Sequence, residues 1–139
     1  ECSGPLVVIS ADTAISMMAV NAKQELVGGV ILPGPQLSLS ALVKNTAQLP
    51  QIDLAAKAPA SILGKSTSSC LQNGFVLGTA SLLDGLAERF CAELGPQTAF
   101  YATGNLPIPI REACCTPILY RETLITDGLY RIWMKNKKG

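Results

Sequence analysis

The sequence predicts an α/β domain in which a three-stranded antiparallel meander continues into a mixed sheet flanked by helices. Two observations carry this prediction. Three short apolar runs with tight polar breaks open the chain, and segments of helical spacing then alternate with short apolar runs. Strands joined by connections of hairpin length pair in antiparallel fashion, whereas alternation of helices and strands is typical of α/β proteins. We expect the order β-β-β-α-(β)-α-β-α-α within a single domain, 1–139.

The three opening strands are expected at Pro5–Ile9, Thr13–Val20 and Glu25–Leu32. Their residues are mostly apolar and rich in valine and isoleucine, which favours strands. The polar break Asn21–Gln24 has hairpin length. Two consecutive glycines interrupt the third run, and glycines inside a strand usually mark a bulge or a close approach of backbones.

Two helices should follow the meander. The first is expected from about Gln36 to Leu49, where Pro50 stops it. The segment 51–63 is expected to be a loop with room for one short strand. The second and longest helix should run from about Ser66 to Leu94, with glycines inside it that indicate close packing or a kink. Its predicted apolar stripe consists of Leu71, Phe75, Leu82, Leu86, Phe90 and Leu94.

The last third should contain one strand and two helices. The strand is expected at Thr98–Ala102 and is followed by the turn 103–105. A short helix should begin after Leu106, and a final helix should run from Glu122 to about Lys135. Its predicted apolar face consists of Leu124, Leu129, Ile132 and Trp133.

Composition excludes several classes of function. The net charge is +1, which gives no electrostatic case for nucleic acid or for a membrane surface. No apolar run approaches the roughly 18–20 residues that a membrane span needs. Apolar residues make up 48% of the chain and charged residues 15%, so we expect one face to pack against something outside this sequence. A first residue other than methionine, Glu1, agrees with a piece of a longer protein.

The chain contains no histidine and five cysteines, which restricts its chemistry. Catalysis by Ser-His-Asp or Cys-His cannot be built from it, and zinc sites of the usual kinds are disfavoured. The neighbours Cys114 and Cys115 could form a redox site, but buried small hydrophobic residues in a reducing cytoplasm fit better. Asp84 and Glu88 lie one helical turn apart, and a solvated face is the simpler interpretation.

Five short strings resemble the type III pantothenate kinases in order and spacing. They include that family's glycine-rich third strand, a helix of the pattern "AL…TA.LP", a glycine-threonine loop, an Ala-Thr-Gly turn and a terminal Gly-Leu helix. The strings are Leu26–Gly34, Leu39–Pro50, Gly64–Thr67, Ala102–Asn105 and Asp127–Leu129. The likeness covers nearly the whole chain.

The resemblance implies the C-terminal lobe of an actin-like, RNase H-like kinase of the acetate and sugar kinase class. It implies ATP-dependent phosphorylation of pantothenate, the first step of coenzyme A synthesis, in the cytoplasm. Magnesium would accompany ATP, and potassium or ammonium would assist in the family. An N-terminal lobe, absent from this chain, would supply the main phosphate loop and the catalytic base. A homodimer is also implied.

The resemblance assigns the nucleotide side of the cleft to two turns. In the first, Thr13 follows Asp12 between two strands, where a hydroxyl and backbone amides can reach a phosphate. The alternative is a turn threonine that bonds its own backbone. In the second, Thr103 and Gly104 follow a buried strand, and glycine there lets the backbone approach a ring or phosphate closely. Asn105 stands where the family has a second glycine.

The substrate side is assigned to the start of the long helix. By resemblance Thr67 binds pantothenate, with Gly64 in the same loop. Free amides and the positive end of a helix dipole suit a polar or anionic ligand. The alternative is simple capping of the helix by Ser66 or Thr67.

Two positions depart from the family pattern. Ser10 stands where the family has the aspartate assigned to a monovalent cation, and Met18 stands where it has a second aspartate. Asp12, in place of a glycine, is a possible substitute. Because phosphoryl transfer depends on positioning and charge neutralisation, a second hypothesis is a non-catalytic relative that acts in binding or regulation. A third is a structural fragment that needs a partner domain.

Overall fold

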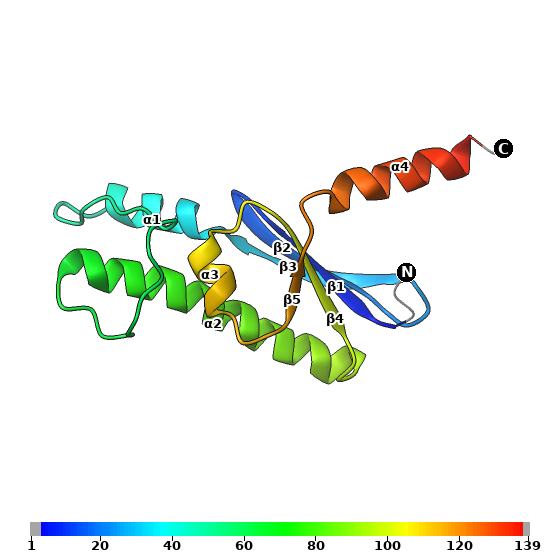
Figure 1. The fold of residues 1–139 in the computed structure, drawn as a ribbon, viewed down its shortest axis with the longest axis horizontal. Coiled ribbons are helices and arrows are strands. Elements are labelled where there is room, and N and C mark those ends of the chain that lie inside the picture. The colour runs from blue at the N-terminus through cyan, green and yellow to red at the C-terminus, as the bar shows by residue number, and fades with distance from the viewer. Residues whose placement is uncertain (1–3, 138–139) are drawn as a thin grey trace.

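The computed structural model describes residues 4–137, and its centre is one five-stranded sheet (Figure 1). The strand order is β3-β2-β1-β4-β5. β1 and β2 pair in antiparallel fashion, as do β2 and β3, whereas β4 lies parallel to β1 and to β5. The predicted meander within a mixed sheet is therefore confirmed. The strands are β1 (Leu6–Ala11), β2 (Ala14–Val20), β3 (Leu26–Pro33), β4 (Ala99–Gly104) and β5 (Ile118–Tyr120).

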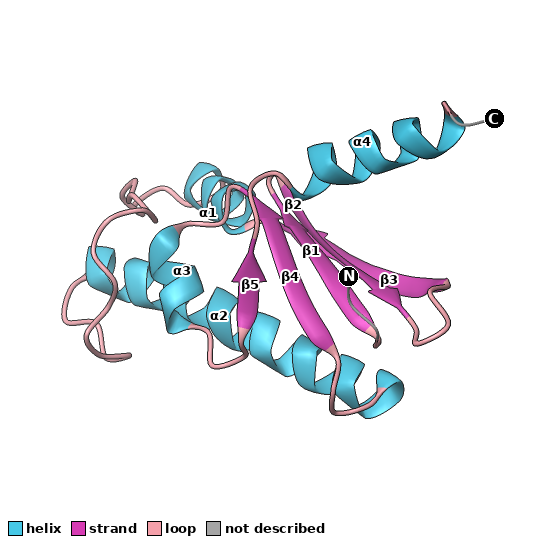
Figure 2. Ribbon diagram, turned by 45° about the vertical axis from the view of Figure 1, so that its right-hand side comes forward, coloured by secondary structure: helices cyan, strands magenta, loops and turns pink. Residues whose placement is uncertain are grey.

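Three of the four helices in the described part of the chain cover one face of this sheet (Figure 2). The fourth lies on the side of the opposite face, where it lines a cavity with Leu6, Val8 and Tyr101. The long helix carries residues that join the sheet in one buried cluster, and it also packs against the two shorter helices. No helix within residues 4–137 is long and apolar enough to cross a bilayer. The helices are α1 (Pro35–Lys44), α2 (Thr67–Leu94), α3 (Ile108–Ala113) and α4 (Leu124–Asn136).

The core follows from strict alternation along the strands. In β1 every second side chain is buried and its neighbours are only half-covered, so one face meets the helices and the other does not. β2 repeats this pattern, and β4 follows it as far as Ala102. The bulge predicted from the two glycines of β3 is present, because the register with β2 shifts between Ala19 and Val20. The buried sheet residues are Val7, Ile9, Ala11, Ile15, Met17, Ala19, Phe100 and Ala102.

The apolar stripe predicted for α2 was wrong in its centre. Leu82 is 41% exposed, whereas Leu83 is fully buried. Small residues, Ala80 and Ala87, let the helix axis approach the sheet closely, and the bulky residues that spacing singled out flank this contact. The bulky residues predicted from helical spacing therefore mark the edges of the packed face of α2. The buried α2 residues are Asn73, Val76, Ala80, Leu83 and Ala87.

Two other element predictions need correction. Helix α1 ends at Lys44 because the Asn45 side-chain amide donates to the Ala41 carbonyl (2.7 Å) and the Thr46 hydroxyl donates to another last-turn carbonyl (2.8 Å). The segment 51–63, which the structure describes throughout, contains no strand. The additional strand is β5, a three-residue strand that the sequence reading missed.

Candidate functional site

The carboxyl ends of β1 and β4 lie side by side and form the first part of the site. Ala11, the last residue of β1, is the register partner of Gly104 at the end of β4. The β1–β2 turn contributes Asp12 and Thr13, which are exposed, and Asn105 is exposed beyond β4. We call these four exposed residues, Asp12, Thr13, Gly104 and Asn105, the strand-end rim. Both turns that the sequence assigned to the nucleotide side therefore belong to one edge.

Chain topology makes this edge a reasonable place for a ligand. From β1 the chain leaves toward β2 and β3, and it returns through α2 to β4 on the other side of β1. The connections diverge between these two parallel strands. In open α/β sheets, ligands bind outside the carboxyl ends of strands at such a switch point.

Gly104 is required by its backbone and by its surroundings. Its φ is +94°, which L side chains rarely adopt, and a Cβ atom there would overlap the Ala11 carbonyl oxygen. The same carbonyl accepts a hydrogen bond from the Asn105 amide at 2.5 Å. The two strand ends are thus tied together, and the rim is held before any ligand arrives.

Gly34, at the start of α1, packs against the turn that carries Asp12 and Thr13. Its amide donates to the Thr13 carbonyl at 2.9 Å. A Cβ atom at Gly34 would overlap the Asp12 carbonyl oxygen, so only glycine permits this packing. The amide of Asp12 donates to the Ala14 carbonyl at 2.9 Å, which closes the turn. Thr13 itself is exposed in this turn.

Thr103 and Ser10 lie on the sheet face that the helices leave uncovered. Thr103 is 2% exposed, and its hydroxyl donates to the Glu122 carbonyl at 3.3 Å. Its side chain therefore anchors the segment before α4, so a nucleotide role would fall to its backbone. Ser10 pairs in register with Ser16 on one side and Thr103 on the other. This neutral row of three hydroxyl residues includes Ser10, where the family pattern led us to expect a carboxylate.

The second part of the site is the start of α2. Ser66 is the N-cap: its hydroxyl accepts from the Ser69 amide at 3.2 Å, and the Ser69 hydroxyl accepts from the Ser66 amide at 2.9 Å. Thr67 is the first helical residue and is exposed. Of the two capping alternatives, Ser66 is the correct one. A Cβ atom at Gly64 would lie 2.7 Å from the Cys70 Cα, so this glycine lets the loop pack on the first turn.

A cavity of about 580 Å³ lies beside this helix start, between the 51–60 loop and α2. Ser66, Ser69 and Gln72 are among its lining residues. Gln72 lines the cavity, and its buried Nε2 has no hydrogen-bond partner within residues 4–137. The neighbouring Asn73 amide donates to the Ser61 carbonyl at 2.8 Å and so holds the loop in place. Sequence reasoning missed Gln72, because a glutamine on a helix ordinarily faces solvent.

Within this chain the two parts stay separate. A groove of about 230 Å³ connects the β3–α1 corner with α2, and it reaches α2 at Gly74 and beyond. Thr67 lies seven residues earlier, about 10 Å along the helix axis at about 1.5 Å per residue. The structure therefore brings Thr13 and Gly104 together, and it does not bring Thr67 to them.

The charges at the rim do not form a metal site by themselves. Among residues 4–137 there is no group of three or more histidine, cysteine, aspartate or glutamate residues that could hold a metal. Asp12 is the carboxylate of the rim. Magnesium takes only one or two protein carboxylates alongside substrate phosphates. The rim would therefore supply one carboxylate ligand to magnesium. A monovalent cation would meet only the neutral hydroxyl oxygen of Ser10.

The electrostatics near α3 indicate that Cys114 is a structural rather than a reactive cysteine. Burial raises the pKa of the Cys114 thiol to about 11, and the Asp84 carboxylate and Cys115 contribute to the same rise. Burial also raises the pKa of Asp84, but hydrogen bonds from the Cys115 amide (2.9 Å) and the Thr116 amide (2.8 Å) leave it lowered overall. Asp84 therefore holds the α3–β5 connection and is not simply solvated. Cys115 is exposed, so only Cys114 of this pair behaves as expected; Cys2 lies outside the described residues.

An open mixed sheet flanked by helices, with strand ends that meet at a switch point, is the arrangement at which α/β proteins commonly bind ligands. Comparison narrows the class: a family model of type III pantothenate kinases matches residues 1–89. The chain is 38% identical over 137 residues to a type III pantothenate kinase of Koribacter versatilis, covering 98% of this chain and 49% of that protein. A Solibacter usitatus protein of the same description is 35% identical over 133 residues, covering 96% and 50%. The chain belongs to the type III pantothenate kinase family.

The chain spans about half the length of these relatives. One solved structure, a conserved putative Baf family transcriptional activator from Campylobacter jejuni, superposes with a TM-score of 0.68 at 20% identity. The match covers 99% of this chain and 60% of the other. At that identity the likeness supports the fold alone.

Proposed function

We propose that this chain is one lobe of an enzyme that phosphorylates pantothenate to 4′-phosphopantothenate with ATP. The observation that carries the proposal is the strand-end rim in a member of this family: two turns far apart in sequence meet at a switch point. The fold would be half of an actin-like kinase, and the setting would be the cytoplasm.

In this proposal the rim binds ATP. The Thr13 hydroxyl would donate to a phosphate, and the backbone around Gly104 would lie against the nucleotide. Asp12 would share magnesium with the phosphates. When bound, the ion would neutralise the charge that phosphoryl transfer develops. Potassium or ammonium would be held weakly, because neutral Ser10 replaces a carboxylate.

Pantothenate would bind at the α2 start. Thr67 offers a hydroxyl at the positive end of the helix dipole, and Gln72 adds a buried, unpartnered donor at the adjacent cavity. Gly64 keeps the loop close to the helix. Because Thr67 lies away from the rim in this chain, the upstream lobe or a second copy would have to close the cleft. The exposed glycines of α2 would allow close contact between copies in a homodimer.

Chemistry would be shared with the upstream lobe. Asp12 is the only carboxylate among the four rim residues, so the catalytic base and the main phosphate loop would come from outside this chain. The isolated chain should therefore bind ligands weakly and turn over nothing. Ser10 and Met18, which replace two carboxylates of the family pattern, favour one alternative, a non-catalytic relative that binds without phosphorylating.

The test is pantothenate-dependent formation of ADP by the full-length protein. Thr13→Ala should raise the KM for ATP, and Thr67→Val should raise the KM for pantothenate, each about tenfold, as expected for one lost hydrogen bond. Ser40→Ala, at an exposed position of α1, is the control. ATP binding without ADP formation would favour the non-catalytic alternative. Unchanged constants in both variants would remove these residues from the site.

A further inference from the structure

Helix α4 carries an apolar stripe that the described part of the chain leaves exposed. Ile125, Leu129, Ile132 and Trp133 follow the spacing i, i+4, i+7, i+8, which places them on one side of a helix. They are 56%, 61%, 60% and 52% exposed. None of the thirteen α4 residues is buried. An isolated helix of this length is only marginally stable in water, so α4 needs a packing partner.

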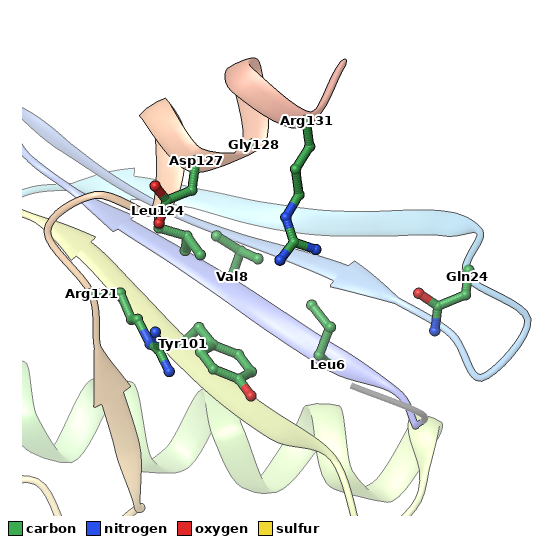
Figure 3. A pocket seen from close by; sticks show the side chains of 9 residues that line it. All are labelled: Leu6, Val8, Gln24, Tyr101, Arg121, Leu124, Asp127, Gly128 and Arg131. Carbon is green, nitrogen blue, oxygen red and sulfur yellow. The ribbon is translucent and has the colours of Figure 1, made fainter. Parts of the chain in front are cut away.

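The stripe does not face the helix's own sheet. The side of α4 that faces the sheet carries Leu124, Gly128 and Arg131, which line a cavity of about 410 Å³ together with Leu6 and other residues of the uncovered sheet face. Figure 3 shows the Arg131 side chain reaching from α4 toward that face. At about 100° per residue, Leu129 points about 100° away from Gly128 and about 160° away from Arg131. A partner on the stripe must therefore come from beyond α4.

We propose that the α4 stripe is an interface for the upstream lobe of the same protein. The relatives are about twice as long as this chain, so a comparable length of polypeptide is available. A segment joined ahead of β1 would enter at Leu6, which lines the cavity below α4. A tethered partner at this position acts at high effective concentration and needs little affinity of its own. The inference rests on the part of the proposed function that supplies an upstream lobe.

The uncovered sheet face supports the same occupant. Parallel strands are normally covered on both faces, yet on the second face of β1 and β4 the described residues place only α4, across a cavity of about 410 Å³. Leu119 on β5 is 56% exposed. Lys135 lies in the last turn of α4, and the Lys137 Nζ lies 4.6 Å from the centre of the Trp133 ring. The surface of the upstream lobe that meets α4 should therefore be apolar with an acidic rim.

Photo-crosslinking of the full-length protein tests this interface. Leu129→p-benzoylphenylalanine should form a covalent link to a peptide that precedes Glu1 in the same polypeptide, identified by mass spectrometry. Arg131→p-benzoylphenylalanine is the matched control. Its position is on the side of α4 that faces the sheet, so it should link to residues 6–8 of β1. Links from position 129 to a second copy, or to phosphatidylserine vesicles added during irradiation, would overturn the proposal, as would no link while the control reacts.

Hydrogen exchange on the unmodified full-length protein gives a second measurement if either variant folds poorly. The amides of α4 should exchange about tenfold or more slowly than in the isolated chain. Equal rates would overturn the proposal. Neither readout needs catalytic turnover, so loss of pantothenate-dependent ADP formation with these results intact would overturn the proposed function alone.

Discussion

Replacing Gly104 by alanine should loosen the junction that builds the strand-end rim. An L side chain in the left-handed region costs roughly 1–2 kcal/mol. The new Cβ atom would also overlap the Ala11 carbonyl oxygen, and relief requires the ends of β1 and β4 to separate. That separation would break the bond from the Asn105 amide, whose net contribution is about 1 kcal/mol. The free energy of unfolding should fall by about 2–3 kcal/mol, the sum of these two effects.

Urea denaturation followed by circular dichroism measures this loss. Gly85→Ala is the matched control: it lies inside α2 with ordinary space around it, so alanine should stabilise the protein by up to about 1 kcal/mol. If Gly104→Ala changed the free energy of unfolding by less than about 0.5 kcal/mol, as surface substitutions do, the argument for a constrained rim would fail.

Three further predictions follow from the packing and from the α3–β5 connection. Leu83→Ala should lower the free energy of unfolding by about 2–5 kcal/mol and Leu82→Ala by much less; the opposite ranking in urea titrations would restore the stripe predicted from spacing. Asp84→Asn should cost about 1 kcal/mol, because Asp84 is partly exposed and loses an acceptor for a backbone amide. Since the folded state lowers the pKa of Asp84, the carboxylate's contribution to stability is present above the ordinary pKa of 3.8 and fades as the pH falls below it. In thermal melts between about pH 5 and about pH 3, the melting temperatures of wild type and variant should therefore converge as the pH falls. A constant difference in melting temperature would contradict this assignment. Iodoacetamide at about pH 8 should label exposed Cys115 before Cys114, whose pKa of about 11 keeps the thiol protonated; mass spectrometry of the labelled peptides would show the reverse order if Cys114 were the reactive thiol.

Local signals predicted most of the elements, because they depend on short stretches of chain. The four longest strands lie within two residues of their predicted bounds, and the glycines of β3 do accompany a bulge. β5 was missed because three residues carry no period, and its position depends on contacts distant in sequence. The Arg111 guanidinium lies 3.5 Å from the centre of the Tyr120 ring, and Asp84 holds the preceding loop.

The candidate site was likewise predictable where it depends on local sequence and unpredictable where it depends on tertiary contacts. Thr13 and Gly104 could be predicted as turn residues, and their meeting follows once β1 and β4 are parallel neighbours. The buried donor of Gln72 could not be predicted, because it depends on how the 51–60 loop folds over α2. The hydroxyl of Thr103 also depends on tertiary structure, since its acceptor lies nineteen residues later in the chain.

Under the proposed function, the reaction would be divided between two lobes. The backbone of the rim is closely packed: Gly34 and Gly104 make contacts that no side chain would permit, so the turn that carries Thr13 is held without help from a ligand. Yet the rim carries a single carboxylate, Asp12, and phosphoryl transfer needs several charges placed around the moving group. A preorganised surface that lacks charge is well suited to positioning one substrate while another lobe supplies the reacting groups. The exposed stripe of α4 then acquires a role in the same scheme, because a lobe that brings those groups must be held in register with the rim.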